Sequence, residues 1–300
     1  MNLFWATYKN IEKELLNMLN YIQFDDKQIN DYSTKFIDIL LKTSIEIEAI
    51  SKQLYLDNGG PIFNNEDEMY FDTVCLKYLE DKFSLSKKII YVNNINMYFE
   101  KNENIELTPL HKSFKRGSSG SVWKKGYQSI KHNRIKNYKF GNMKNAIHAL
   151  GALFILNLYY KNQRFDFENE SETNKFDLSL GSELFTIKLN KDTHNLMEDI
   201  TPDDTAIYNL KLRDEDRAEF IEIQKNINAN IMKFFIEDIR FNKALQSGEI
   251  TLEQLQSDFI GTMIKVLGTE DYPKLVGRAV SQSKMHTKLN QRRFYAYLNV

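Results

Sequence analysis

Apolar residues recur at helical spacing along most of the first half of the chain. One series with alternating steps of four and three predicts a long helix over residues 32–56. Its members are Phe36, Leu40, Thr43, Ile47, Ile50 and Leu54. Further helices are predicted over residues 4–19, 66–83, 123–133 and 142–160. The last of these is apolar on nearly every face, which favours a central position in a helical bundle.

The pattern changes in the second half. Residues 183–189 and 206–212 alternate as strands do, and residues 220–239 follow the spacing of an amphipathic helix. Thr251 and Gln254 form a capping box ahead of another helix. Residues 87–99 fit either a strand or a buried helix, and the acidic residues 165–177 look like a linker. We therefore expect a mainly α protein, with a helical bundle over residues 1–165 and a mixed, mostly helical α+β region over residues 175–300.

Composition narrows the functional classes. A single cysteine, Cys75, excludes a disulfide framework, and five dispersed histidines argue against a metal cluster. The longest apolar run, residues 146–160, is too short and too polar to span a bilayer. The first residues lack the basic start of a signal peptide. We expect a cytoplasmic protein that uses no cofactor, no metal and no membrane.

Charge is distributed unevenly. Residues 107–165 contain no Asp or Glu and carry +12, and residues 272–300 again contain none and carry +6. With a net charge of −1, the rest of the chain carries −19. A dense field of one sign attracts a polyanion, which favours RNA as a partner. The alternative is that both basic segments pack against the acidic remainder of the chain or of a second copy.

One segment carries candidate chemistry. Together with the apolar helix that follows, residues 121–134 resemble the C-terminal helix pair of the HEPN superfamily, whose members occur in phage-defence and toxin–antitoxin systems. The matching residues are Trp123, Tyr127, Ile130, Lys131, His132 and Arg134. The resemblance implies a helical homodimer that cleaves RNA without a metal, with a cognate antitoxin or defence partner. In that chemistry an imidazole moves the proton of the attacking ribose 2′-hydroxyl and a guanidinium stabilises the phosphoryl oxygens.

This chain departs from the family's motif where the arginine is expected. Tyr127 occupies that position, and Gln128 occupies the polar one. His132 and Arg134 would lie about 160° apart on a continuous helix, whereas Gln128 and His132 share a face. A composite site therefore needs either a helix break near Asn133 or an Arg134 from a partner subunit. Our candidate catalytic residues are His132, Arg134, Tyr127 and Gln128, and our candidate nucleic-acid-binding residues are Arg116, Lys124, Lys125, Lys131 and Lys136.

Other interpretations stay open at this point. The motif could belong to a non-catalytic nucleic-acid-binding or regulatory module, a reading that the tyrosine at the arginine position favours. The basic segments could instead make the chain a scaffold for an acidic partner protein. Residues 117–120 lack the frame of a P-loop. We interpret them as a flexible connector, with phosphate binding at the next helix N-terminus as the weaker alternative.

Overall fold

The computed structural model describes residues 2–65, 68–116, 120–191 and 198–300. Most of the described chain is helical, as predicted for a mainly α protein. Its helices are α1 (Leu3–Asn17), α2 (Thr34–Asp57), α3 (Lys77–Phe83), α4 (Asn102–Ile105), α5 (Val122–His132), α6 (Arg134–Asn137), α7 (Met143–Lys161), α8 (Glu170–Thr173), α9 (Asp214–Glu237), α10 (Ile239–Gln246), α11 (Leu252–Ser257), α12 (Phe259–Gln282) and α13 (Met285–Asn290). Residues 66 and 67 of the helix predicted over residues 66–83 lie outside the described residues. The described part of that helix is a π-helical stretch at Phe71–Leu76 that runs into α3.

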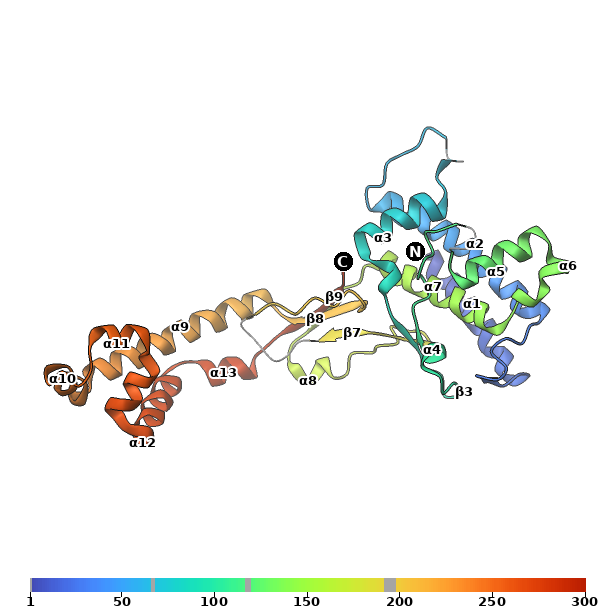
Figure 1. Ribbon diagram of the computed structural model, residues 1–300. Helices are drawn as coiled ribbons and strands as arrows, with labels where there is room; N and C mark the ends of the chain where they lie inside the picture. Colours follow the sequence, from blue (N-terminus) through green and yellow to red (C-terminus); the bar gives the residue numbers. More distant parts are fainter. Residues whose placement is uncertain (1, 66–67, 117–119, 192–197) are drawn as a thin grey trace.

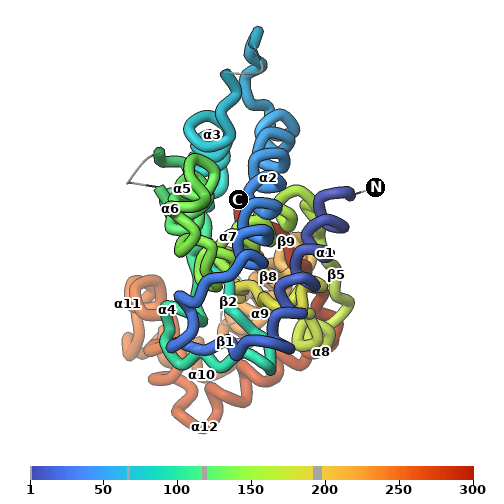
Figure 2. Tube along the Cα trace, turned by 90° about the vertical axis from the view of Figure 1, so that its right-hand side faces the viewer, coloured from blue at the N-terminus to red at the C-terminus, as the bar shows by residue number. Residues whose placement is uncertain are grey.

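Helix α7 lies at the centre of the helical body. It is buried on nearly all sides, as its apolar sequence predicted, and α1, α2 and α5 pack around it (Figure 2). Its buried Asn157 donates its side-chain amide to the Leu153 carbonyl at 3.0 Å. Gly151 allows a strand to approach closely, because a Cβ there would lie 2.8 Å from Ile90 Cδ1. The helix thus joins the bundle to the sheets.

The strands are short and most of them pack on this helical body. They are β1 (Phe24–Asp25), β2 (Ile90–Val92), β3 (Met97–Tyr98), β4 (Glu106–Leu107), β5 (Phe165–Phe167), β6 (Phe185–Ile187), β7 (Leu189–Lys191), β8 (Tyr208–Leu212) and β9 (Phe294–Leu298). They form sheets in the orders β1-β3, β4-β2-β6 and β5-β9-β8-β7. In the largest, β8 and β9 are antiparallel from Tyr208↔Leu298 to Leu212↔Phe294. Residues 87–99, which fitted either a strand or a helix, therefore supply strands.

The apolar core does not separate into two parts at residues 165–175, where we expected the boundary between two regions. One cluster unites the N-terminal helices with strand residues as distant as Tyr208 and Phe294. The segment expected to be a linker forms β5 and α8, because the rings of Phe165 and Phe167 pack on Phe176 at centroid distances of 5.0 and 5.6 Å. Aromatic burial thus outweighs the polar composition of that segment.

Helices α9 to α13 follow β8 and precede β9 in the sequence, and together they form a projecting part that we call the arm. Figure 1 shows the arm extending from the sheet on the side opposite α5 and α6. The arm has its own apolar cluster, which includes Phe235, Phe241 and Met263. The capping box at Thr251 and Gln254 is confirmed at the start of α11. The predicted helix over residues 220–239 corresponds to α9.

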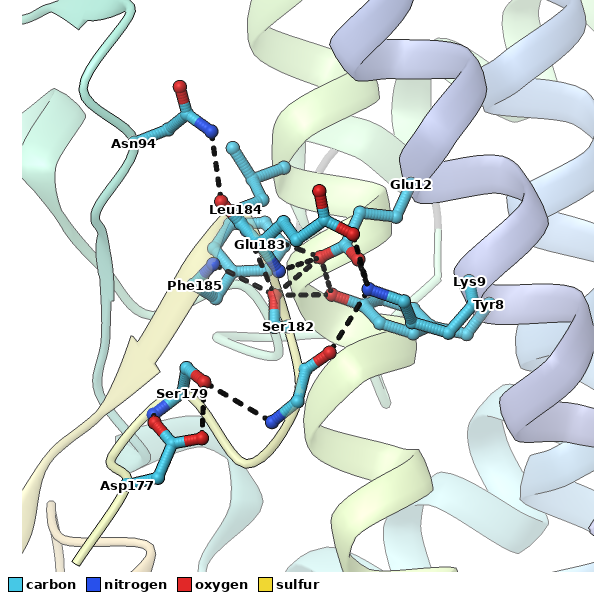
Figure 3. A network of polar contacts seen from close by, with 11 residues as sticks. Tyr8, Lys9, Glu12, Asn94, Asp177, Ser179, Ser182, Glu183, Leu184 and Phe185 are labelled. Carbon is cyan, nitrogen blue, oxygen red and sulfur yellow. Dashed lines mark hydrogen bonds and ion pairs between the residues drawn. The ribbon is translucent and has the colours of Figure 1, made fainter.

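A buried carboxylate joins the first helix to strand β6 (Figure 3). Glu12 on α1 is fully buried, and its Oε1 accepts a hydrogen bond from the Tyr8 hydroxyl at 2.7 Å. The same oxygen accepts the Ser182 hydroxyl and the backbone N–H groups of residues 183 and 184, the latter two at 3.0 and 3.2 Å. Burial and the neighbouring Glu12 raise the pKa of Tyr8. These hydrogen bonds satisfy a charge that would otherwise be costly inside the fold.

Within the described residues, no helix is both long and apolar enough to cross a membrane.

Candidate functional site

Helix α5 ends at His132, two residues before Arg134. Asn133 leaves the helical conformation, with φ −154° and ψ 88°, and its side chain accepts a hydrogen bond from the Lys136 N–H at 3.0 Å as the N-cap of α6. The break that a composite site would need is therefore present. It directs Arg134 elsewhere, however, because that guanidinium pairs with Asp38 on α2 at 3.1 Å, and both side chains are exposed. Arg134 does not line the cleft that contains His132.

That cleft has a volume of about 580 Å³ and lies between α2, the π-helical stretch and α5. We call it the α5 cleft. Helix α5 contributes four residues whose spacing places them on adjoining faces, and the other walls come from distant parts of the sequence. The lining residues are Glu48, Tyr70, Phe71, Asp72, Arg116, Lys124, Gln128, Lys131 and His132. Gln128 and His132 thus meet in one site, as their spacing predicted, and the His132 side chain is exposed.

Asp72 neutralises part of the positive charge at the cleft wall. This carboxylate is 5% exposed and lies 3.2 Å from Lys124 Nζ, while Arg116 Nε lies 3.2 and 3.3 Å from its two oxygens. Burial opposes ionisation, but the Thr73 N–H, Lys124 and Arg116 together lower the pKa of Asp72. Lys124 is itself buried, and its ammonium also donates to the carbonyls of residues 113 and 115. Lys124 therefore stabilises the wall from within, and we assign it no nucleic-acid contact.

Tyr127 lies behind the cleft and not in it. The ring is 3% exposed, and burial, together with the neighbouring Glu48, raises the pKa of the phenol. Lys131 Nζ lies 3.4 Å from the phenol oxygen. The phenol stays neutral and cannot replace the charge of the arginine that the HEPN motif carries at this position. The phenol group of Tyr127 interacts with the carboxylate of Glu48 and the ammonium of Lys131.

The two basic segments of the sequence have different environments. Carboxylates compensate much of the second, because Asp216 pairs with Lys288 and Arg293, and Glu170 pairs with Arg292. The view that a basic segment packs against acidic parts of the chain is correct there. In the first segment Lys125, Lys131 and Lys136 are exposed and make no ion pair with any described residue. Lys131 lines the α5 cleft, whereas Lys125 and Lys136 lie outside it.

Four residues of the cleft were not predicted from the sequence: Glu48, Tyr70, Phe71 and Asp72. Glu48 lies on α2 beside the apolar seam that contains Ile47, and Asp72 follows the aromatic pair Tyr70–Phe71. The ring of Tyr70 carries the Arg116 guanidinium at 4.3 Å from its centroid. Glu48 could have been noticed in the sequence, because an acidic residue next to a buried apolar seam is a candidate for a functional side chain. Nothing in the sequence places Asp72 beside Lys124, because that contact forms only in the tertiary fold.

No group of three histidine, cysteine, aspartate or glutamate side chains is arranged to hold a metal ion in the described part of the chain. Comparison with known proteins finds no matching family model, no matching curated protein and no matching solved structure.

Proposed function

We propose that the α5 cleft binds single-stranded RNA and cleaves it without a metal ion, with His132 as an acid–base group. The observation that carries the proposal is the exposed imidazole of His132 in one cleft with the cations Lys131 and Arg116 and the carboxylate of Glu48. An imidazole and a carboxylate are the two groups that can move protons in this reaction. Tyr70, half exposed at the rim, offers a ring on which a base can stack.

The reaction is a transesterification at one phosphodiester. The ribose 2′-oxygen forms a bond to phosphorus and loses its proton to the base, and the bond from phosphorus to the 5′-oxygen breaks. The leaving 5′-oxygen takes a proton from the acid, so the products are a 2′,3′-cyclic phosphate and a 5′-hydroxyl. In this assignment Glu48 and His132 share the two proton transfers, and Lys131 and Arg116 stabilise the phosphoryl oxygens.

The biological setting follows from the HEPN resemblance and is part of the proposal. It is a cytoplasmic homodimer with a role in phage defence or a toxin–antitoxin pair, regulated by a cognate antitoxin or defence partner. A second copy would bring another His132 and another set of exposed lysines to a shared RNA. This arrangement predicts that a dimer is the active form.

A second candidate is a module that binds RNA without cleaving it. The ion pairs of both neighbouring guanidiniums favour it, because Arg116 pairs with Asp72 and Arg134 pairs with Asp38. The neutral phenol of Tyr127 at the motif's arginine position adds to this argument. Such a module would show salt-sensitive RNA binding and no products.

The test is cleavage of a labelled single-stranded RNA in excess EDTA. The wild-type protein should produce cleavage, and His132→Ala should lower the rate by about 100-fold or more, the usual contribution of an acid–base group. His286→Ala is the matched control, because this exposed histidine lies on α13 outside the cleft. RNA binding without any cleavage would select the second candidate. No RNA binding at low salt would reject both candidates and leave a protein scaffold.

A further inference from the structure

A second pocket, of about 270 Å³, lies at the other end of α5, where the helix begins. We call it the helix-start pocket. Its lining residues include His111, Lys112, Ser121, Lys125 and His148. The walls are fixed by Trp123, which is buried and donates its indole N–H to the Pro109 carbonyl at 2.8 Å. The pocket is therefore a structured feature with histidine and lysine side chains around it.

The helix start inside this pocket lacks its usual hydrogen bonds. Ser121 is the N-cap of α5, yet its side chain caps no backbone N–H. The residue is 7% exposed, and its hydroxyl oxygen is buried without a hydrogen-bond partner among the described residues. No described group accepts the N–H groups of residues 122–124 either. Because buried polar groups are nearly always satisfied, the Ser121 oxygen indicates a ligand that supplies the missing partner. The free N–H groups at the helix start are donors that such a ligand can use.

The chemistry of the walls fits a phosphoryl group. Helix N-termini bind anions through their free N–H groups and the positive end of the helix dipole. Lys112 and Lys125 are exposed cations without an ion pair to any described residue. Burial and the nearby Lys144 lower the pKa of His148 to about 4, so its neutral ring has one N–H to donate at neutral pH. Among the described residues, no carboxylate lines the pocket to repel an anion.

The two sites are connected along a single face of α5. Ser121, Lys125, Gln128 and His132 follow one another at steps of four, three and four, which places them in one stripe of the helix. The stripe runs from the helix-start pocket to the α5 cleft. Its length is about 16 Å, the span of at most about five stacked nucleotides. A linear polyanion can therefore follow this face from one site to the other.

We propose that the helix-start pocket is a phosphate subsite, in which Ser121, Lys125 and the first N–H groups of α5 bind a backbone phosphate of the RNA strand whose scissile phosphodiester lies at His132. This inference rests on the proposed function for the source of the phosphate. The pocket itself makes an independent prediction, because free inorganic phosphate presents the same oxygens.

The first experiment titrates inorganic phosphate into the full-length protein and follows the histidine ring signals by NMR. His111 and His148 should shift along a saturating curve. Ser121→Ala should weaken the phosphate affinity about tenfold without lowering stability, because it removes an oxygen that has no described partner. Lys125→Gln should weaken it similarly, whereas Lys139→Gln, on an exposed side chain outside the pocket, should not. No saturable shift at His148, or wild-type affinity in both pocket variants, would overturn the subsite.

The second experiment identifies the source of the phosphate. Wild-type protein should prefer an oligonucleotide of about eight residues over a dinucleotide, and Ser121→Ala should reduce that preference several-fold. His132→Ala should lower the cleavage rate by about 100-fold or more while the phosphate shift at His148 persists. If phosphate saturates the pocket and the RNA preference is unaffected by Ser121→Ala, the pocket binds free phosphate and the RNA assignment is wrong. If wild type never cleaves RNA, the proposed function fails while the titration still decides the pocket.

Discussion

Replacing Asp216 with asparagine should weaken the interactions that hold the arm against the sheet and so lower the stability of the protein. Asp216 lies in the first turn of α9 and has no exposed surface. Its Oδ1 accepts hydrogen bonds from Lys288 Nζ at 2.8 Å and from Arg293 Nη2 at 2.7 Å, and its Oδ2 accepts the Arg293 backbone N–H at 2.8 Å. The carboxylate thus connects α9 with the two segments that close the arm, α13 and the entry to β9.

The size of the effect follows from the loss of a buried ion pair and from the depressed pKa of the carboxyl group. Breaking a buried ion pair by removing one partner destabilises a protein by about 3–5 kcal/mol. Independently, burial would raise the pKa of Asp216, but hydrogen bonds from Arg293 and Lys288 outweigh it and lower the pKa from 3.8 to about 2. A shift of that size corresponds to about 2 kcal/mol at neutral pH. We therefore expect Asp216→Asn to lower the free energy of unfolding by roughly 2–5 kcal/mol.

The assay is urea denaturation followed by circular dichroism at several pH values. Because the folded-state pKa is depressed, the stabilisation is complete above about pH 4 and is lost as the pH falls towards about 2. This part of the pH dependence should disappear in Asp216→Asn. The matched control is Asp81→Asn, which breaks an exposed pair with Lys77 and should change stability by less than about 0.5 kcal/mol. If Asp216→Asn lowers the free energy of unfolding by less than about 1 kcal/mol and leaves the pH profile unchanged, Lys288 and Arg293 do not have the structural role that we give them.

Three further predictions follow from buried or partly buried ionisable groups. Asp72→Asn leaves the buried ammonium of Lys124 without its counter-ion, so urea denaturation should show a free energy of unfolding lower by about 3 kcal/mol. A decrease of less than about 1 kcal/mol would contradict the ion pair. Burial lowers the pKa of Lys161 to about 8, and its Nζ lies 3.0 Å from the ring centroid of Trp5. Tryptophan fluorescence should therefore titrate with a midpoint near pH 8 in the wild type, and the same midpoint in Lys161→Met would show that another group is responsible. Burial raises the pKa of Cys75 to about 11, so iodoacetamide should alkylate this thiol only when urea unfolds the chain; rapid alkylation of the folded protein at pH 8 would contradict its burial.

Elements with a strong apolar pattern could be predicted from the sequence. Helix α7 is apolar on nearly every face, and the centre of the body is the position that can bury such a surface. Residues 294–298 mix aromatic and apolar side chains. They form strand β9, which pairs with both β5 and β8 and places Phe294 and Leu298 in the apolar core. In both cases the burial of side chains decides the structure.

The environment of the candidate site depends on features that a pattern does not contain. One residue, Asn133, leaves the helix and thereby directs Arg134 to Asp38 and away from His132. Asp72 lies 52 positions from Lys124 in the sequence, and only the packing of the π-helical stretch against α5 brings the two charges together. The unbalanced charge of residues 107–165 was visible in the sequence. Which of its lysines stay exposed, such as Lys131, is determined by carboxylates from distant elements.

The most direct test of the account is the chemical identity of the ends produced when the protein meets RNA in excess EDTA. Mass spectrometry of the fragments should show 2′,3′-cyclic phosphate and 5′-hydroxyl ends with the wild-type protein and with His286→Ala. The fragments should be absent with His132→Ala and with a substrate whose scissile ribose lacks its 2′-hydroxyl. Identical fragments from wild type and His132→Ala, or intact RNA in every reaction, would contradict the claim that the cleft around His132 is a ribonuclease site.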